Sequence, residues 1–222
     1  MTGTSMPAIR ICFIGDSITV GTGDETMLGW PGRVCAGARA AGHDVTVYNL
    51  GVRGETSEHI RSRWRAEAGQ RLPVDMNCAL VFAFGLNDCA IENQVRRRVE
   101  PERTVANARA ILTEAKAWLP SIFIGPTPVD DTRLPAQLTP GKEVRIFNTQ
   151  VAAANRALAR VAAEVGVPFL DLFTPLTAQA EWRNLMRRGD GIHPPARGYE
   201  WIAQLVEEWK PWRDLLGQSP GA

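Results

Sequence analysis

Short apolar segments, rich in β-branched and aromatic residues, recur along the chain and end at glycine, proline or polar residues. Their length is typical of strands rather than of helices. Most are apolar on both faces, and helix-length stretches separate them, so we expect a parallel sheet with helices packed on both sides. The predicted strands are residues 9–14, 45–48, 79–84, 122–124 and 168–170.

Helical periodicity fills the intervals between the later strands. Apolar residues recur at steps of three and four over residues 105–119 and again over 144–165, which predicts two helices that each bury one stripe. Pro120 ends the first helix, and Gly166 ends the second. A last helix is predicted over residues 196–209.

The size and charge of the chain restrict its organisation and partners. With 222 residues and 45% hydrophobic content, residues 1–222 can form a single domain, with flexible ends expected at 1–7 and 217–222. The 25 basic and 24 acidic residues nearly cancel, so we expect no nucleic-acid partner and a small neutral substrate instead. The basic run at 96–98 is interpreted as a solvated face without a functional role.

The sequence favours a cytoplasmic location. It shows no secretory signal at its beginning and no apolar stretch near the roughly 20 residues that span a bilayer, so we expect no stable membrane anchor. Its four cysteines are widely separated and lack the spacing of a metal site, so they are interpreted as reduced thiols. No metal is expected. The sequence does not determine the oligomeric state, and a homo-oligomer is one of the alternatives.

Polar loops follow the first three predicted strands. Residues 15–17 read Gly-Asp-Ser, residues 49–54 contain two glycines, and residues 85–88 read Gly-Leu-Asn-Asp. Because the carboxyl ends of parallel strands meet at one edge of a sheet, these loops should lie together. Residues 190–193, Asp-Gly-Ile-His, precede the last predicted helix and can fold over the same edge.

Together these loops supply the groups that nucleophilic catalysis by a serine requires. A serine hydroxyl needs a neighbouring base, the base needs an orienting partner, and the developing oxyanion needs hydrogen-bond donors. The four blocks, in this order, resemble the GDSL esterase/lipase family, also called SGNH hydrolases, over nearly the whole chain. The resemblance implies a three-layer α/β/α sandwich with a flavodoxin-like central parallel sheet of about five strands. It also implies that Ser17 is the nucleophile, His193 the base and Asp190 its orienting acid.

The same resemblance implies an oxyanion hole made of the backbone N–H groups of Ser17 and Gly51 and the side-chain amide of Asn87. Glycine lets the backbone approach a substrate without a Cβ in the way, and an amide offers a neutral donor. The departures from the family pattern are small: Ile18 stands where the family name has leucine, and Leu86 where threonine is common.

Two other carboxylates and one glycine pair lie close to these blocks. Asp16 and Asp88 are interpreted as turn-stabilising residues, and Asp190 is preferred as the catalytic acid because of its spacing from the histidine. The glycines at 21 and 23 suggest a dinucleotide loop, but its third glycine would fall at Thr26. No cofactor is therefore expected.

The function predicted from the sequence is hydrolysis of a small-molecule carboxylic ester through an acyl-enzyme on Ser17. The same machinery could serve a thioesterase, an amidase or a carbohydrate O-deacetylase, and a flavodoxin-like binding domain, with or without a nucleotide, is the alternative without catalysis. Residues 126–142 follow the fourth predicted strand and are too irregular for a helix, so we hypothesise that they partly cover the substrate pocket. The natural substrate and the acyl-chain preference are not readable from the sequence.

Overall fold

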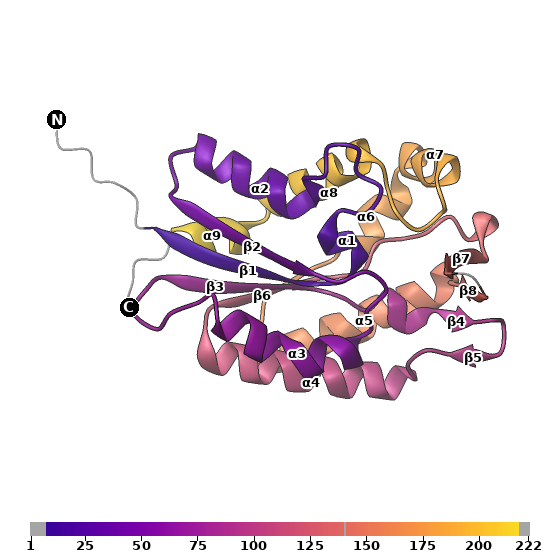
Figure 1. Ribbon diagram of the computed structural model, residues 1–222, viewed down its shortest axis with the longest axis horizontal. Coiled ribbons are helices and arrows are strands. Elements are labelled where there is room, and N and C mark those ends of the chain that lie inside the picture. The colour runs from indigo at the N-terminus through magenta and orange to yellow at the C-terminus, as the bar shows by residue number, and fades with distance from the viewer. Residues whose placement is uncertain (1–7, 140, 218–222) are drawn as a thin grey trace.

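The computed structural model describes residues 8–139 and 141–217, which form three layers with a parallel sheet in the middle (Figure 1). The sheet has five strands in the order β2-β1-β3-β6-β9. Helices α3, α4 and α5 cover one face, and α1, α2 and α8 lie on the other (Figure 1). The predicted three-layer α/β/α fold is confirmed.

The strands are those that the apolar segments predicted, with small shifts at their ends. Their bounds are β1 Ile9–Gly15, β2 Val45–Gly51, β3 Cys78–Ala83, β6 Ser121–Ile124 and β9 Phe169–Leu170. In the register of the sheet, Gly15 at the end of β1 lies opposite both Gly51 of β2 and Ala83 of β3. The three loops that follow these strands therefore begin at one level, on the same edge of the sheet.

The helices bury the apolar stripes that the periodicity predicted. Their bounds are α1 Ser17–Val20, α2 Gly29–Ala40, α3 Ser57–Gly69, α4 Pro101–Trp118, α5 Asn148–Val165, α6 Phe173–Ala178, α7 Ala180–Arg188, α8 Ala196–Glu208 and α9 Lys210–Leu216. Proline stands in the first turn of α4, where its missing N–H costs nothing, and Gly166 ends α5 with a left-handed φ of 76°.

The helix predicted over residues 144–165 begins later than expected, so its predicted start at residue 144 was wrong. Val144 lies in strand β8, Lys142–Arg145, and α5 begins only at Asn148. Phe147, just before the helix, has extended backbone angles of −112° and 132°. Val144 and Phe147 continue the helical spacing of apolar residues by coincidence, because a buried strand residue is as apolar as a buried helix residue.

A second, antiparallel sheet lies beyond the main one, at the carboxyl edge of its strands (Figure 1). It has the order β5-β4-β8-β7 and contains β4 Ile91–Glu92, β5 Arg96–Arg97 and β7 Ala136–Thr139 besides β8. Residues 126–142, interpreted from the sequence as irregular, thus include a 3₁₀ turn, Asp131–Arg133, and strand β7. Strands of two to four residues are too short to show a period, so the sequence pattern missed this sheet.

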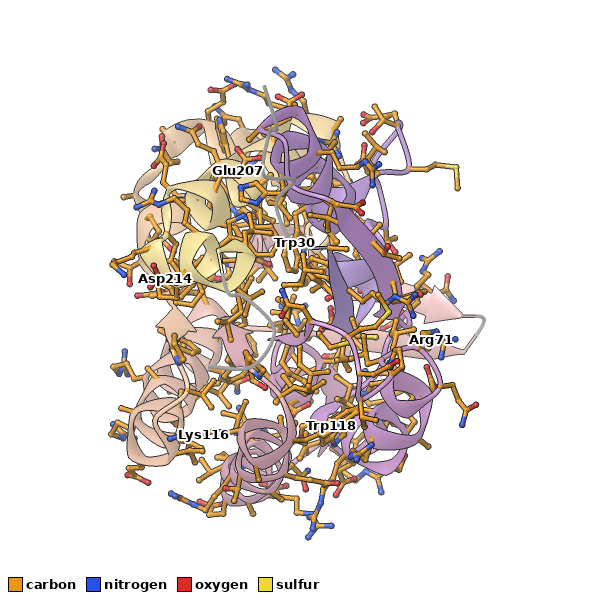
Figure 2. The ribbon with its side chains drawn as sticks, turned by 90° about the vertical axis from the view of Figure 1, so that its left-hand side faces the viewer. Trp30, Arg71, Lys116, Trp118, Glu207 and Asp214 are labelled. Carbon is orange, nitrogen blue, oxygen red and sulfur yellow. The ribbon has the colours of Figure 1, made fainter. Side chains whose placement is uncertain are left out.

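Two apolar clusters fill the space on either side of the main sheet. Trp30 and Trp182 belong to the cluster beneath α2 and α8, and Trp64 belongs to the cluster beneath α3 and α4. Figure 2, turned by 90°, shows Trp30 in the interior of the molecule. The ring of Trp30 packs edge-on against Phe13 of β1, with 5.3 Å between ring centroids. These tryptophans serve packing, which holds the strand that carries Gly15 in place.

All four cysteines are buried and free. Burial raises the pKa of Cys12, Cys35 and Cys89 to about 12, so these thiols are protonated at neutral pH. Within residues 8–139 and 141–217, no helix is long and apolar enough to cross a membrane. Flexible ends were expected at residues 1–7 and 217–222. Of these, residues 1–7 and 218–222 lie outside the described residues, and Gly217 caps the end of α9.

Candidate active site

Ser17 is the first residue of α1, directly after the end of β1. Asp16 caps this short helix, because its Oδ1 accepts the backbone N–H of Ile18 at 3.0 Å. The turn between strand and helix needs glycine at position 15, where a Cβ would lie 2.3 Å from the carbonyl oxygen of Ala83. The tight turn presents the hydroxyl of Ser17 at the carboxyl edge of the sheet, although only 5% of the residue is exposed.

A hydrogen-bonded series joins the three residues predicted as catalytic. Nε2 of His193 lies 2.8 Å from Oγ of Ser17, and Nδ1 of His193 lies 2.6 Å from Oδ2 of Asp190. Oδ1 of Asp190 accepts the backbone N–H groups of Ile192 and His193, both at 2.8 Å. A carboxylate at Nδ1 favours the tautomer that carries its hydrogen there, which leaves Nε2 as the acceptor for the serine hydroxyl.

Asp190 is ionised in this arrangement, although its side chain is 48% exposed. Partial burial would raise the pKa of its carboxyl. The hydrogen bonds from the His193 ring and from the backbone of His193 and Ile192 outweigh this effect and lower the pKa to about 2. The negative charge next to the imidazole stabilises the imidazolium that forms when the histidine takes a proton.

The loop that carries His193 rests on the segment after β6. Asp130 donates its backbone N–H to the carbonyl oxygen of Gly191 at 2.8 Å, and a Cβ at Gly191 would lie 2.8 Å from Cβ of Arg133. Earlier in this segment, Pro126 and Thr127 help to line a cavity of about 20 Å³ beside Asp16, which has room for about one water. The start of the segment thus supports the site, and the hypothesis that residues 126–142 cover a substrate pocket stays a prediction.

Asn87 begins a 3₁₀ turn, Asn87–Cys89, after β3 and faces the loop of Ser17. Its Nδ2 donates to Oδ2 of Asp16 at 3.2 Å, and its Oδ1 accepts from Nη1 of Arg98 at 3.3 Å. An amide nitrogen has two hydrogens, so one of them remains for a substrate. Asp16 therefore touches both the helix of the serine and the amide predicted as an oxyanion donor.

Gly51 packs closely against the serine helix, but its N–H already has a partner. It donates to Oδ1 of Asn49 at 3.0 Å, and Nδ2 of the same side chain donates to the carbonyl oxygen of Thr19 at 2.8 Å. A Cβ at Gly51 would lie 2.6 Å from the backbone nitrogen of Val20. The close approach explains why glycine stands here. To serve an oxyanion, the Gly51 N–H would have to leave Asn49.

Gly54, three residues further along the same loop, is placed differently. It has a left-handed φ of 76°, and apart from its neighbours in the chain no atom lies within 4 Å of the position that its Cβ would take. Its carbonyl oxygen accepts from Nη2 of Arg98 at 2.7 Å, which ties it to the residue that also holds Asn87. Among the described residues, none accepts a hydrogen bond from the N–H of Gly54. The sequence analysis did not single out this glycine.

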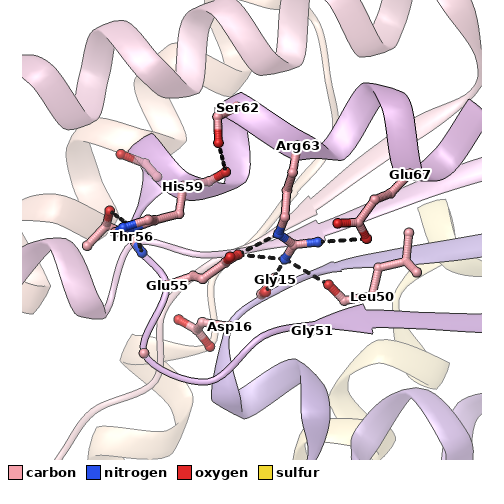
Figure 3. A network of polar contacts seen from close by, with 12 residues as sticks. Gly15, Asp16, Leu50, Gly51, Glu55, Thr56, His59, Ser62, Arg63 and Glu67 are labelled. Atoms are coloured by element: carbon pink, nitrogen blue, oxygen red, sulfur yellow. Dashed lines mark hydrogen bonds and ion pairs between the residues drawn. The ribbon is translucent and has the colours of Figure 1, made fainter.

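Arg63 of α3 fixes the ends of β1 and β2 from the outside, as Figure 3 shows. Its Nη2 donates to the carbonyl oxygens of Leu50 at 2.9 Å and Gly15 at 3.3 Å. Glu55 neutralises the guanidinium at 2.6 Å, and Glu67 does so at 3.2 Å. Because the Arg63 side chain is only 15% exposed, water screens these contacts weakly. They hold the two strands in register where the site begins.

Asp88 stabilises the loop next to Asn87. Its Oδ1 accepts the backbone N–H of Ser57 at 2.7 Å, and this serine is the first residue of α3. The hydroxyl of Ser57 in turn accepts from Nδ2 of Asn107 on α4 at 2.9 Å. Burial raises the pKa of the Asp88 carboxyl, against the hydrogen bonds from Ser57. These contacts join the third strand's loop to two helices, in keeping with the interpretation of Asp88 as a structural residue.

The interpretation of residues 96–98 as a solvated face was wrong for Arg98. Its side chain is partly buried and contacts both Asn87 and Gly54. The neighbouring Arg96 is exposed. Arg97 is partly buried as well, and nothing in the spacing of three consecutive arginines distinguishes these two from the exposed Arg96.

Asp16 is almost fully buried, with 3% of the residue exposed. Burial raises the pKa of its carboxyl to about 6, against the hydrogen bond from Ile18, the nearby His193 and the hydrogen bond from Asn87. The folded state therefore holds a proton on Asp16 more tightly than the unfolded chain does. The contribution of this group to stability falls as the pH rises from about 4 to about 6, and stays low above that range.

Replacing Asp16 with asparagine should remove this pH dependence. Relative to the wild type, the free energy of unfolding of Asp16→Asn is expected to rise by on the order of 2 kcal/mol between about pH 4.5 and about pH 7.5. Denaturant unfolding at both pH values measures it. Asp44→Asn is the matched control, because the Asp44 side chain is 63% exposed. A difference between Asp16→Asn and the wild type that is constant with pH would contradict the expectation.

The fold and the site together define a class. A parallel α/β sheet whose carboxyl edge carries a serine hydrogen-bonded to a histidine, itself hydrogen-bonded to an aspartate, is the arrangement of serine hydrolases. The chain belongs to the GDSL-like Lipase/Acylhydrolase family, whose sequence model matches residues 13–201. The family resemblance predicted from the four blocks is confirmed.

Solved structures of several hydrolases share the fold at low sequence identity. The lipase/acylhydrolase from Enterococcus faecalis is 24% identical, with a TM-score of 0.73 over 96% of this chain and 98% of that chain. The psychrotrophic esterase EstA from a Pseudoalteromonas species, in a structure inhibited by monoethylphosphonate, is 17% identical, with a TM-score of 0.66 over 92% and 98%. An acetylxylan esterase from Geobacillus stearothermophilus is 19% identical, with a TM-score of 0.63 over 97% of both chains. No curated protein sequence matches this chain.

Proposed function

We propose that the protein is a serine acylhydrolase that cleaves carboxylic esters through an acyl-enzyme on Ser17. The observation that carries the proposal is the series of short contacts from Oγ of Ser17 to Nε2 of His193 and from Nδ1 of His193 to Oδ2 of Asp190, at 2.8 and 2.6 Å. Each group lies within the reach that proton transfer requires before any substrate is present.

In the first step, Oγ of Ser17 attacks the acyl carbon while Nε2 of His193 takes its proton. The carbonyl oxygen becomes an oxyanion, and when the tetrahedral intermediate collapses, His193 returns the proton to the leaving alcohol. In the second step, a water attacks the acyl carbon on Ser17, His193 takes a proton from it, and the acid leaves as the serine regains its hydrogen.

The oxyanion is held by donors from the three strand-end loops. The N–H of Ser17 is the first of α1 and has no partner within the helix. Asn87 offers its remaining amide hydrogen. The third donor comes from the loop after β2, where the N–H of Gly54 has no acceptor among the described residues, whereas that of Gly51 donates to Asn49.

Replacing Asn87 with alanine should slow the chemical step without weakening substrate binding to the same extent. Loss of one oxyanion donor is expected to lower kcat by about 10²- to 10³-fold, or roughly 3 to 4 kcal/mol, with a small change in KM. Steady-state kinetics on an ester substrate measures both constants. Asn184→Ala is the matched control, since Asn184 is an exposed residue of helix α7. A rise in KM alone would remove Asn87 from the oxyanion hole.

Esters are proposed as the substrate class because esterases, among them EstA and the acetylxylan esterase, share this fold. The same geometry could act on a thioester, an amide or an O-acetylated carbohydrate. Purified protein should be tested on p-nitrophenyl acetate and butyrate, on the matching thioester and anilide, and on an acetylated sugar. The proposal expects the highest kcat/KM on an oxygen ester. A higher value on the thioester or the anilide would reassign the substrate class.

We propose that the reaction takes place in the cytoplasm and that the ligand is a small-molecule ester. Free, buried cysteines support a reducing compartment. Cell fractionation tests the location, and size-exclusion chromatography with light scattering tests whether the protein forms a homo-oligomer.

A further inference from the structure

Arg98 lies at the base of the β4–β5 hairpin, close to the oxyanion loops. Its backbone N–H donates to the carbonyl oxygen of Ala90 at 2.9 Å, and its neighbour Arg97 pairs with Ile91 across the hairpin. These contacts fix the backbone from which the side chain starts. The side chain is partly buried, and its hydrogen bonds to Asn87 and Gly54 hold it in one direction.

The guanidinium of Arg98 spans two of the catalytic loops. Nη1 donates to Oδ1 of Asn87 at 3.3 Å, in the loop after β3, and Nη2 donates to the carbonyl oxygen of Gly54 at 2.7 Å, in the loop after β2. A planar fork can hold two acceptors at a fixed separation, which a lysine ammonium cannot do in the same way. One side chain therefore sets the distance between Asn87 and Gly54.

The same contact determines which way the Asn87 amide faces. Arg98 donates to its oxygen, and Asp16 accepts one of its hydrogens at 3.2 Å. If the amide were turned over, its NH₂ group would face the donors of Arg98, and its oxygen would face a carboxylate. Both contacts would be repulsive. With the two ends held, the second hydrogen of Nδ2 is the one left for a substrate.

The charge of Arg98 is also favourable here. Asp16 and Asp88 are both buried, and Arg98 interacts electrostatically with each of them and with Glu92. A cation that donates to the amide oxygen polarises the amide, which makes its free N–H a stronger donor toward a developing negative charge.

We propose that Arg98 is a positioning residue of the active site, which orients the Asn87 amide and the Gly54 loop toward the oxyanion. The proposal rests on the proposed function, because it takes Asn87 as an oxyanion donor. Arg98 does not touch the reacting atoms. It acts through Asn87 and Gly54, and its dependence on Asn87 can be measured.

The kinetic test is a double-mutant cycle with Arg98→Gln, Asn87→Ala and the double variant. Arg98→Gln is expected to lower kcat about 10- to 100-fold with little change in KM, and Arg98→Lys should keep part of the activity because it retains a charge and one donor. In the Asn87→Ala background, Arg98→Gln should lower kcat clearly less than it does in the wild type, since one of the two groups through which it acts is gone and only the contact with Gly54 remains. Arg96→Gln is the matched control from the same run, because Arg96 is exposed.

A second measurement does not depend on finding an ester substrate. In a ¹⁵N-labelled sample, the side-chain NH₂ resonances of Asn87, assigned by their loss in Asn87→Ala, should move in Arg98→Gln and Arg98→Lys but not in Arg96→Gln. The proposal would be overturned if Arg98→Gln lowered kcat by the same factor in the wild type and in Asn87→Ala. It would also be overturned if the Asn87 resonances did not move. If the wild type hydrolyses no ester, the proposed function fails, and the resonances still decide whether Arg98 orients the amide.

Discussion

Replacing Ser17 with alanine is expected to lower kcat for p-nitrophenyl butyrate by about 10⁴- to 10⁶-fold, because the covalent step has no substitute nucleophile. The hydroxyl lies 2.8 Å from Nε2 of His193, and the other described contacts of the site do not depend on it. A stopped or continuous assay of p-nitrophenol release measures the loss. The thermal midpoint should stay close to that of the wild type, since the change removes one oxygen from the edge of the core.

A fluorophosphonate probe gives an independent readout of the same change. It should label the wild type at Ser17 and leave Ser17→Ala unlabelled, because phosphonylation uses the same hydroxyl and the same base. Ser62→Ala is the matched control, since Ser62 is exposed and its hydroxyl only donates to the carbonyl oxygen of His59. Hydrolysis that persists in Ser17→Ala at the wild-type rate would refute the assignment of the nucleophile.

The sheet and the position of its site could be predicted because they depend on local patterns. Buried strands are apolar on both faces, and the ends of parallel strands share an edge, so the loops at Ser17 and Asn87 had to meet. The register, with Gly15 opposite Gly51 and Ala83, shows how closely they do. Asp190 and His193 could be recognised only from their spacing and from the three other sequence blocks, since a histidine alone says little about its partners.

The hydrogen bonds inside the site could not be predicted, because they depend on which way a peptide or a side chain faces. Both Gly51 and Gly54 occupy the correct loop, yet only the structure shows that Asn49 takes the N–H of Gly51. Arg98 is one of three consecutive arginines, and its inward direction follows from the β4–β5 hairpin, whose two-residue strands carry no period. Sequence patterns therefore predict which groups lie near the carboxyl edge of the sheet, but they do not predict how these groups are oriented.

The two carboxylates of the site are specialised by their surroundings. Asp16 is buried, and burial raises its pKa to about 6, whereas Asp190 is half exposed and hydrogen bonds from the histidine loop lower its pKa to about 2. Asp190 is therefore a permanent anion next to the imidazole. Asp16 instead joins the serine helix to Asn87. Because it is buried, its ionised form lowers the free energy of unfolding of the protein.

Replacing Asp190 with asparagine is expected to lower kcat by about 10³- to 10⁴-fold, because it favours the wrong tautomer of His193. Oδ1 of Asp190 accepts two backbone N–H groups, so the oxygen of an asparagine would stay there and its NH₂ group would face the imidazole. Nδ1 would then accept, and Nε2 would carry the hydrogen toward Ser17. A protonated Nε2 cannot take the serine proton.

Asp190→Ala should lose less activity than Asp190→Asn, and this order is what identifies the tautomer as the cause. The Asp190 side chain is 48% exposed, so in Asp190→Ala water can reach Nδ1 and accept its hydrogen, and the imidazole can adopt the productive tautomer. Steady-state kcat for both variants, at a pH where the wild type is fastest, measures the order. Two-dimensional NMR of the imidazole nitrogens reports the tautomer directly, with Nε2 protonated in Asp190→Asn. Equal losses in the two variants, with the same tautomer as the wild type, would show that Asp190 contributes through its charge alone.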